Sequence, residues 1–221
     1  MPEKFYKYIS PVLAFLFIIL ALGMIHANSQ GASFNDNDNF VVYPQNELNP
    51  VIETSQNNPA MPIDRASDRV TKKPFGIYVT PQNSPVNPER FTGYHTGTDF
   101  ETFPEEADLD VTVNAILPGK IVYKKWTSGY GGLLVEESMI DNSPVTIIYG
   151  HLNLYSIDKK IGSELTKGER IGVLGKGYSK ETDGERKHLH LAIHKGTVID
   201  LKGYVKSKNE LNNWIDPDSL L

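Results

Sequence analysis

Apolar residues in the last two thirds of the chain come in short runs separated by turn signals. The runs are rich in β-branched and aromatic residues, and dipeptides such as Pro118-Gly119 and Lys167-Gly168 lie between them. This pattern is typical of β-strands joined by tight turns. It predicts one all-β domain over residues 74–221, built on a small antiparallel β-sheet or sandwich core. A short helix is expected at Lys206–Trp214, and strands are expected at Phe75–Val79, Val111–Ile116, Lys120–Trp126, Leu133–Glu136, Val145–Tyr149, Arg170–Leu174 and His188–His194.

The N-terminus has a different pattern. Lys4 and Lys7 precede a segment without charge from Tyr8 to Ile25, and small or polar residues follow it. A secretory signal has an apolar segment of about 7–15 residues, whereas a membrane-spanning helix needs roughly 17–25. The segment fits both, so residues 1–27 are predicted to be a signal peptide or an N-terminal membrane anchor. Either alternative places the rest of the chain outside the cytoplasm, secreted or anchored by residues 8–25, because the basic flank stays on the cytoplasmic side.

Residues 28–73 are rich in Asn, Gln, Ser, Pro and Asp. Such a composition buries too little apolar surface to offset the entropy of ordering, so a disordered linker is predicted, either a tether or a loosely docked arm. Asn39–Tyr43 is apolar enough to add an edge strand or to lie in a groove as part of a pro-peptide, but we favour a plain tether.

Composition narrows the function classes. The 221 residues include 22 basic and 27 acidic side chains, a net charge of −5, which offers no basic surface for a phosphate backbone; no nucleic-acid partner is predicted. Cysteine is absent, which excludes disulfides, cysteine-ligated zinc, iron–sulfur clusters and a thiol nucleophile. Any metal must therefore be bound by His, Asp or Glu. Five of the six histidines lie between residues 95 and 194.

Three short motifs contain candidate ligands. In the expected strand His188–His194, alternation directs Leu189 and Leu191 to one face and both His188 and His190 to the other. His95 and Asp99 share a face of an extended chain, with Gly97 between them leaving room for an ion. Taken alone, the first motif also fits a surface strand, and the second a hydrogen-bonded turn.

The third motif is Tyr149-Gly150-His151-Leu152, at the end of an apolar strand. A histidine that follows a glycine at a strand end is free to reach a neighbouring site, although alone it is more often a surface residue.

Neutral imidazole and carboxylate are suitable zinc ligands, and His95, Asp99 and His190 make three. Three protein ligands and an open position are typical of catalytic rather than structural zinc.

The order and spacing of these three motifs resemble those of the lysostaphin-type (LytM-like) zinc endopeptidases, which cut peptide cross-links of bacterial peptidoglycan. The resemblance covers about residues 76–217, and the segments Asp110–Val122, Lys167–Gly175 and Trp214–Pro217 also look like the family's. It implies an active-site groove in the all-β domain and one Zn²⁺ per domain. Peptidoglycan stem peptides or cross-bridges are the implied partners, together with the membrane if the N-terminal segment is not removed.

Carried over residue by residue, the resemblance implies that His95, Asp99 and His190 bind the zinc ion. It implies that His151 and His188 are catalytic residues that do not bind it. One of these two imidazoles can take a proton from water, and the pair can hydrogen-bond an oxyanion. The sequence leaves open which of them is the general base.

Three features depart from the family pattern. Family members often have a tyrosine six residues before the first ligand, where Glu89 stands in this chain, while Tyr94 lies next to the ligand. The acidic insertion Glu101–Leu109 is expected to be a solvated loop near the groove, with a preference for amine-bearing peptides as a second interpretation. His194 has no counterpart in the family motif and is predicted to have no role in the site.

Two other functions stay open. Some relatives have lost metal ligands and activate other wall hydrolases, so a catalytically silent domain is one alternative. A wall-binding module with a structural metal is another, and it requires a fourth protein ligand. The bond cleaved is also not determined by the sequence.

Overall fold

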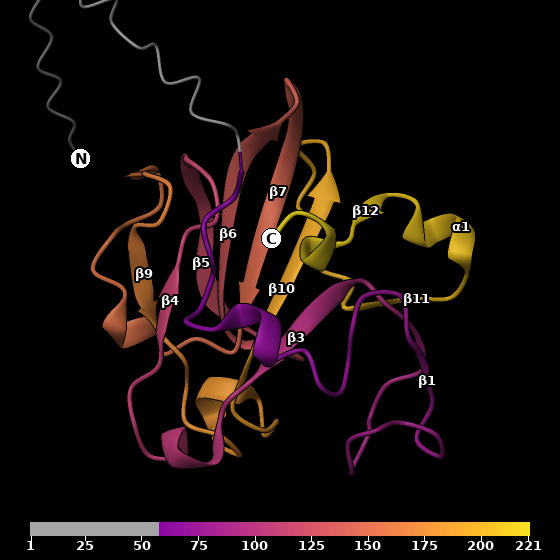
Figure 1. Ribbon diagram of the computed structural model, residues 1–221. Helices are drawn as coiled ribbons and strands as arrows, with labels where there is room; N and C mark the ends of the chain where they lie inside the picture. Colours follow the sequence, from indigo (N-terminus) through magenta and orange to yellow (C-terminus); the bar gives the residue numbers. More distant parts are fainter. Residues whose placement is uncertain (1–57) are drawn as a thin grey trace, which may run out of the picture. The chain divides into compact units, whose positions relative to one another are not determined.

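The computed structural model describes residues 58–221, which fold into short antiparallel strands with very little helix (Figure 1). The all-β prediction is confirmed. The predicted signal or anchor over residues 1–27 and the proposed strand at Asn39–Tyr43 lie outside the described residues. Within residues 58–221, no helix is long and apolar enough to span a membrane.

The main sheet has seven strands in the order β12-β10-β7-β6-β5-β8, and β3 pairs with β10 beside β12. All of its pairings are antiparallel. The strand β10 therefore pairs on both sides, with β3 and β12 along one edge and β7 along the other. The bounds are β3 Gly97–Glu101, β5 Gly119–Thr127, β6 Gly131–Ile140, β7 Ser143–Gly150, β8 Glu164–Leu165, β10 His188–Lys195 and β12 Trp214–Ile215.

Two small sheets and several single helical turns complete the fold. One sheet has the order β1-β2-β11, and the other pairs β4 with β9. Their bounds are β1 Tyr78–Val79, β2 Gly93–His95, β11 Tyr204–Val205, β4 Thr112–Asn114 and β9 Arg170–Val173. The helical turns are η1 Ala66–Asp68, η2 Pro104–Glu106, η3 Leu154–Ser156, η4 Lys180–Thr182, α1 Lys208–Leu211 and η5 Pro217–Ser219.

Each of the seven expected strands corresponds to a strand of the structure. Several of the observed strands are shorter or longer than the predicted ranges. The expected helix at Lys206–Trp214 is reduced to the four residues of α1, after which the chain enters β12. The strand β3 was not expected as a strand, because its sequence Gly-Thr-Asp-Phe-Glu has no apolar alternation. All five of its residues are nevertheless buried, since other parts of the chain cover both faces.

The domain begins earlier than predicted. Residues 58–74, which we call the N-terminal arm, were assigned to the disordered linker up to residue 73, yet they pack along the domain. The Ala60 N–H donates to the Ile116 carbonyl, and the Asn114 N–H donates to the Pro62 carbonyl. Ile63 is completely buried in the core. For residues 58–73 the linker prediction is therefore wrong: a few apolar side chains and backbone hydrogen bonds order a segment of polar composition.

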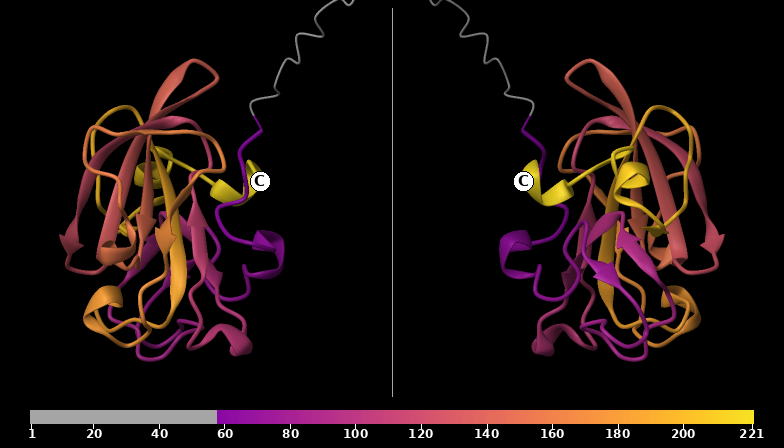
Figure 2. Two further views of the ribbon diagram at one scale, coloured as in Figure 1. Left: turned by 90° about the vertical axis from the view of Figure 1, so that its left-hand side faces the viewer. Right: turned by 90° about the vertical axis from the view of Figure 1, so that its right-hand side faces the viewer.

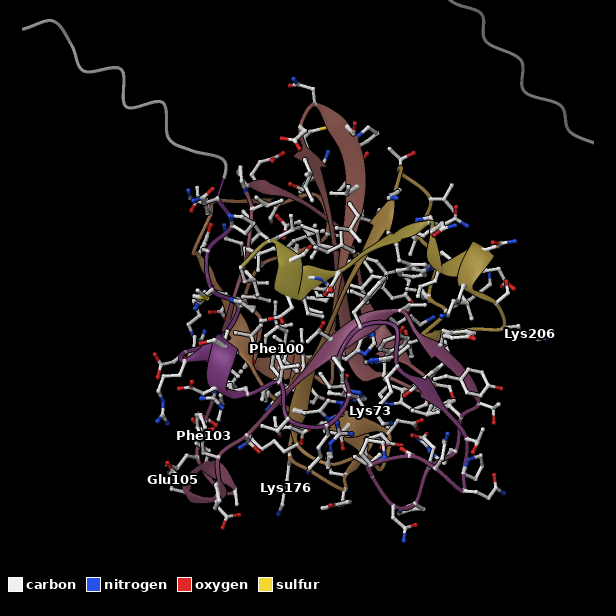
Figure 3. The ribbon with its side chains drawn as sticks, turned by 45° about the vertical axis from the view of Figure 1, so that its right-hand side comes forward. Lys73, Phe100, Phe103, Glu105, Lys176 and Lys206 are labelled. Carbon is white, nitrogen blue, oxygen red and sulfur yellow. The ribbon has the colours of Figure 1, made fainter. Side chains whose placement is uncertain are left out.

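The main core lies on one face of the sheet. Phe100 of β3 is completely buried there, whereas Glu105, Lys176 and Lys206 extend outwards (Figure 3). The N-terminal arm and η5 lie on the same side of the main sheet (Figure 2). Ile63 and Ala66 of the arm pack into the core on the face opposite the one to which β10 directs its histidines.

The buried carboxyl of Glu136 makes the stability of this core depend on pH. Its side chain is inaccessible to solvent, the Tyr149 hydroxyl donates to Oε2 at 2.9 Å, and Oε1 has no hydrogen-bond partner among the described residues. Burial raises the pKa of Glu136 to about 8, although the hydrogen bond from Tyr149 acts to lower it. The carboxyl is thus protonated in the folded protein at neutral pH.

We expect Glu136→Gln to stabilise the protein above pH 5. An unfolded glutamate ionises near about pH 4.3, so the folded state holds an extra proton from there up to the raised pKa, and stability is lost as pH rises through that window. The difference in free energy of unfolding between the variant and the wild type should grow by roughly 3–5 kcal/mol from pH 5 to pH 9, in favour of the variant. Urea denaturation at both pH values measures this gain. Glu137→Gln, on the same strand and partly exposed, is the control, and equal pH slopes for Glu136→Gln and the wild type would refute the prediction.

Candidate metal centre

Strand β10 supplies two histidines to one side of the sheet. Its alternation directs Leu189 and Leu191 into the main core, while His188 and His190 line a cavity on the other face. All four side chains are buried. The orientation predicted for His188 and His190 agrees with this placement.

Strand β3 brings the motif of His95 and Asp99 beside them. In the antiparallel register of β3 and β10, Asp99 lies opposite His190 and Glu101 lies opposite His188. His95 ends strand β2, just before the chain turns into β3. The sequence predicts that Gly97 leaves room for an ion, but in the structure this glycine faces strand β10 instead. A Cβ there would lie 2.4 Å from the Leu191 carbonyl oxygen and 2.9 Å from Cε1 of His190, so this glycine allows β10 to approach.

Three ligand atoms converge from these strands. Nε2 of His95 lies 3.1 Å from Nδ1 of His190 and 3.4 Å from Oδ1 of Asp99, and Nδ1 of His190 lies 3.1 Å from that oxygen. Bonds of about 2.0–2.1 Å at tetrahedral angles separate zinc ligands by about 3.3 Å. The donor set and its spacing therefore fit a divalent metal ion. Within residues 58–221, this group of His95, Asp99 and His190 contains no fourth ligand.

The N-terminal arm orients two of these ligands. Nδ1 of His95 lies 3.3 Å from the Pro74 carbonyl oxygen, which fixes the proton on Nδ1 and leaves the lone pair on Nε2. The Asp99 N–H donates to the Lys73 carbonyl at 2.9 Å. The arm that was expected to be disordered thus forms one wall of the site.

The charge states suit a metal ligand set. Burial acts to raise the pKa of Asp99, but His188, His95 and the Arg186 guanidinium hold it well below its usual range, so the carboxylate is ionised. Burial lowers the pKa of His190 to about 4, so its imidazole is neutral at neutral pH. Metal binding requires an ionised carboxylate and neutral imidazoles.

The other two histidines form a pair beside these ligands. The rings of His151 and His188 have their centroids 4.3 Å apart. His188 donates from Nδ1 to the Arg186 carbonyl at 2.9 Å, and its Nε2 lies 3.3 Å from Oδ2 of Asp99. Burial, followed by the neighbouring His188 and His190, lowers the pKa of His151 well below its usual range. His151 is therefore neutral at neutral pH.

The backbone at His151 is held in a conformation that few side chains adopt. Its φ is +63°, in the left-handed region. The His151 N–H donates to the Tyr130 carbonyl, and the Gly175 N–H donates to the His151 carbonyl. These two hydrogen bonds fix the direction in which the imidazole leaves the end of β7. Nδ1 of His151 has no hydrogen-bond partner among the described residues.

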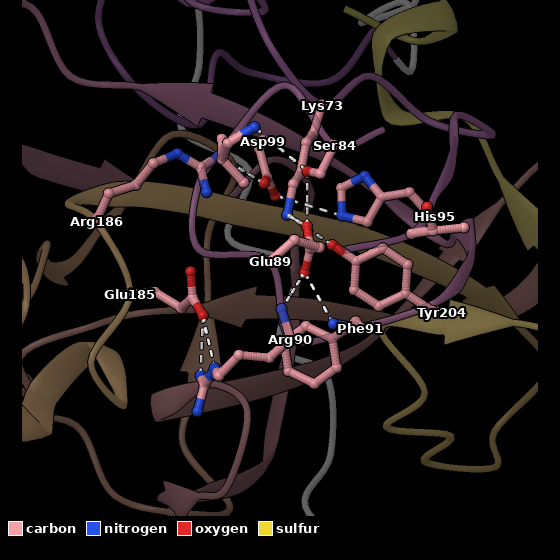
Figure 4. Close-up of polar contacts among 12 residues, drawn as sticks. Lys73, Ser84, Glu89, Arg90, Phe91, His95, Asp99, Glu185, Arg186 and Tyr204 are labelled. Atoms are coloured by element: carbon pink, nitrogen blue, oxygen red, sulfur yellow. Dashed lines mark hydrogen bonds and ion pairs between the residues drawn. The ribbon is translucent and has the colours of Figure 1, made fainter. Parts of the chain in front are cut away.

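All five predicted site residues line one cavity of about 280 Å³. Its walls also contain Lys73, Tyr130, Arg186 and Tyr204, none of which the sequence motifs singled out. The Tyr130 hydroxyl is buried without a hydrogen-bond partner among the described residues. The Tyr204 hydroxyl accepts a hydrogen bond from the Lys73 ammonium at 3.0 Å (Figure 4).

Two positions depart from the family pattern, Glu89 and Tyr94. Neither side chain lines the cavity. The Glu89 carboxylate forms a buried ion pair with Lys73 and accepts hydrogen bonds from the N–H groups of Arg90 and Phe91. The Tyr94 ring packs against Tyr78, with centroids 4.8 Å apart, and is absent from the cavity wall. The tyrosines that line the cavity are Tyr130 and Tyr204 instead.

The acidic insertion Glu101–Leu109 is largely neutralised by its own neighbours. Glu101 pairs with Arg186 and Lys72, and Glu106 accepts both arms of the buried Arg69. The Lys187 ammonium donates to backbone carbonyls of the loop. The interpretation of this loop as a site for amine-bearing peptides therefore has no free cluster of acidic groups to support it.

His194 lies on the same strand as His188 and His190 but outside the cavity. Its ring packs edge-on against Trp214, with centroids 4.8 Å apart. The structure thus places His194 away from the three ligand atoms.

Comparison with known protein families finds one matching family model, which covers the part of the chain that contains the site. Residues 93–202 match the model of Peptidase family M23, and all five site residues fall within this span. A search of the curated proteins finds no match.

Several solved structures resemble the chain. A zinc-containing peptidase from Vibrio cholerae is 25% identical over 61% of this chain, with a TM-score of 0.40, and the match spans only 35% of that protein. LytU is 23% identical over 69% of this chain and 91% of its own, with a TM-score of 0.44. A putative glycyl-glycine endopeptidase LytM from Ruminococcus gnavus is 18% identical over 60% of this chain and 56% of its own, with a TM-score of 0.39.

Proposed function

Through residues 93–202 the chain belongs to peptidase family M23, the lysostaphin-type (LytM-like) peptidases, and from this premise we propose that it is an active zinc endopeptidase. Its proposed substrate is the peptide cross-links of bacterial peptidoglycan. The observation that carries the proposal is the convergence of His95 Nε2, Asp99 Oδ1 and His190 Nδ1 at distances of 3.1–3.4 Å, beside two histidines that are not part of that group.

We assign the metal to His95, Asp99 and His190. The chemistry that zinc supplies when bound is the acidification of a water molecule, towards a pKa of about 7, and the polarisation of a carbonyl. A metal held by these three residues would have no fourth ligand from residues 58–221, which is what a catalytic rather than a structural site requires.

We assign the general base to His188. Its Nδ1 proton is committed to the Arg186 carbonyl, so Nε2 is the nitrogen that can accept and later release a proton. When Nε2 is protonated, the imidazolium lies 3.3 Å from Oδ2 of Asp99, whose negative charge stabilises it. A base held by one hydrogen bond and stabilised by a carboxylate can deliver its proton to the leaving amine.

We assign a hydrogen-bonding role to His151. Because its pKa is well below the usual range, its imidazole is neutral and has one N–H to donate. The hydrogen bonds at its backbone fix the ring beside His188, on the cavity wall. A fixed N–H directed at the oxygen of the scissile carbonyl stabilises the negative charge that develops there.

The proposed location is outside the cytoplasm, either secreted or anchored by residues 8–25. The basic flank at Lys4 and Lys7 and the uncharged segment after it support this location. It also agrees with the proposed substrate, since peptidoglycan lies outside the cytoplasmic membrane. The net charge of −5 argues against a nucleic-acid partner.

Purified protein with equimolar zinc should release soluble muropeptides from purified cell walls, whereas His190→Ala should release none. Chromatography of the supernatant measures the release. If the wild type binds zinc but is as inert as His190→Ala, the enzyme proposal fails. Stimulation of a second wall hydrolase by that inert protein would then favour the catalytically silent activator.

A further inference from the structure

Arg186 lies two residues before His188 and is not one of the five site residues. Its side chain is 10% exposed and enters the site from the loop between η4 and β10. In Figure 4, Arg186 and His95 lie on either side of Asp99. A buried guanidinium is costly unless its donors are satisfied, so its partners show what holds it in place.

The guanidinium of Arg186 joins two carboxylates of strand β3. Nη2 donates to Oδ2 of Asp99 at 2.8 Å, and Nε lies 2.9 Å from both carboxylate oxygens of Glu101. Nη2 also donates to Oε1 of Glu101. Glu101 is in turn paired with Lys72, so the fork is anchored at its far side.

These contacts divide the two oxygens of Asp99 between different partners. Oδ1 faces His95 and His190, and Oδ2 accepts a hydrogen bond from Arg186 at 2.8 Å, with Nε2 of His188 3.3 Å away. A carboxylate whose second oxygen is fixed in this way cannot rotate to turn Oδ1 away from the metal site.

The backbone of the same residue orients the proposed base. The Arg186 carbonyl accepts the Nδ1 proton of His188 at 2.9 Å, which selects the tautomer with Nε2 free. One residue thus fixes a metal ligand through its side chain and a catalytic histidine through its main chain.

We propose that Arg186 is a positioning residue, whose guanidinium fork holds Asp99 in the orientation that binds the metal. This inference rests on the proposed metal centre. Outer partners of metal ligands typically contribute 10–100-fold to metal affinity. Lysine cannot replace the fork, because its ammonium is a point charge without the planar bidentate geometry.

A second explanation makes the opposite prediction. If Arg186 acted only through its positive charge, it would repel a divalent cation, and removing that charge would tighten metal binding. Arg186→Lys keeps the charge and loses the fork, whereas Arg186→Gln loses both. The two variants therefore separate orientation from charge.

The test is the affinity of the metal-free protein for Zn²⁺, measured by competition with a chromogenic chelator, and the visible absorption of the Co²⁺ form, which reports ligand geometry. We expect Arg186→Lys and Arg186→Gln each to lose about 10–100-fold in Zn²⁺ affinity and to show altered Co²⁺ bands. Arg69→Lys is the matched control. Arg69 is also buried and is bidentate on Glu106 but does not touch Asp99, so its variant should keep the wild-type affinity within about threefold.

Unchanged affinity in both Arg186 variants, or tighter binding by Arg186→Gln, would overturn the inference. If Arg186→Gln does not fold, Glu101→Gln loosens the anchor of the fork while leaving Arg186 in place, and it should lose affinity in the same direction. A wild-type protein that binds no Zn²⁺ would instead refute the proposed function, so the two failures are distinguishable.

Discussion

Replacing His188 by alanine is expected to lower kcat by about 10²–10⁴-fold while zinc stays bound. The variant loses Nε2, the proposed proton acceptor, but keeps all three ligand atoms of His95, Asp99 and His190. His151→Ala should also lower kcat and leave metal content unchanged, because it removes a hydrogen-bond donor to the developing oxyanion. Steady-state kinetics together with metal analysis of each purified variant measure both quantities.

His194→Ala is the matched control for these variants. His194 lies on the same strand and packs on Trp214 instead of lining the cavity, so its loss should leave kcat within about twofold. If His151→Ala or His188→Ala weakened zinc binding by more than the 10–100-fold typical of outer partners, that histidine would be a fourth ligand. The metal would then be structural, and the domain a wall-binding module.

The second large effect is the loss of the metal itself. His190→Ala removes Nδ1, which lies 3.1 Å from both other ligand atoms, so its zinc affinity should fall by more than the 10–100-fold typical of outer partners. In the wild type, free zinc at 100 times Kd should raise the free energy of unfolding by about 2.7 kcal/mol. This increment should be absent from His190→Ala.

Thermal unfolding with zinc and with excess chelator measures the increment. His194→Ala should keep it, because that residue contributes no ligand atom. A wild-type melting temperature that does not respond to zinc, or an equal response in His190→Ala, would contradict the assigned ligands.

Much of the site followed from local patterns in the sequence. Alternation along a strand determines that His188 and His190 point the same way, whatever lies beside them. The absence of cysteine restricted the ligands to imidazole and carboxylate. Which strand lies next to β10 is a long-range property, however. The register that sets Asp99 opposite His190 depends on a pairing that no local pattern encodes.

The missed features are long-range as well. The N-terminal arm was interpreted as linker because its composition is polar, yet its carbonyls bind the His95 ring and the Asp99 N–H. Arg186 and Asp99 are 87 residues apart, so nothing near either residue indicates the ion pair. The one available signal was a charged residue placed two positions before a metal motif.

A defined cross-linked peptide gives the most direct test of the central claim. The purified protein with one equivalent of zinc is incubated with a peptide dimer of known linkage, and the products are analysed by mass spectrometry. We predict two fragments whose summed mass exceeds that of the substrate by one water molecule, with none formed by His190→Ala. An intact dimer, left uncleaved by wild-type protein that demonstrably holds its zinc, would contradict the account.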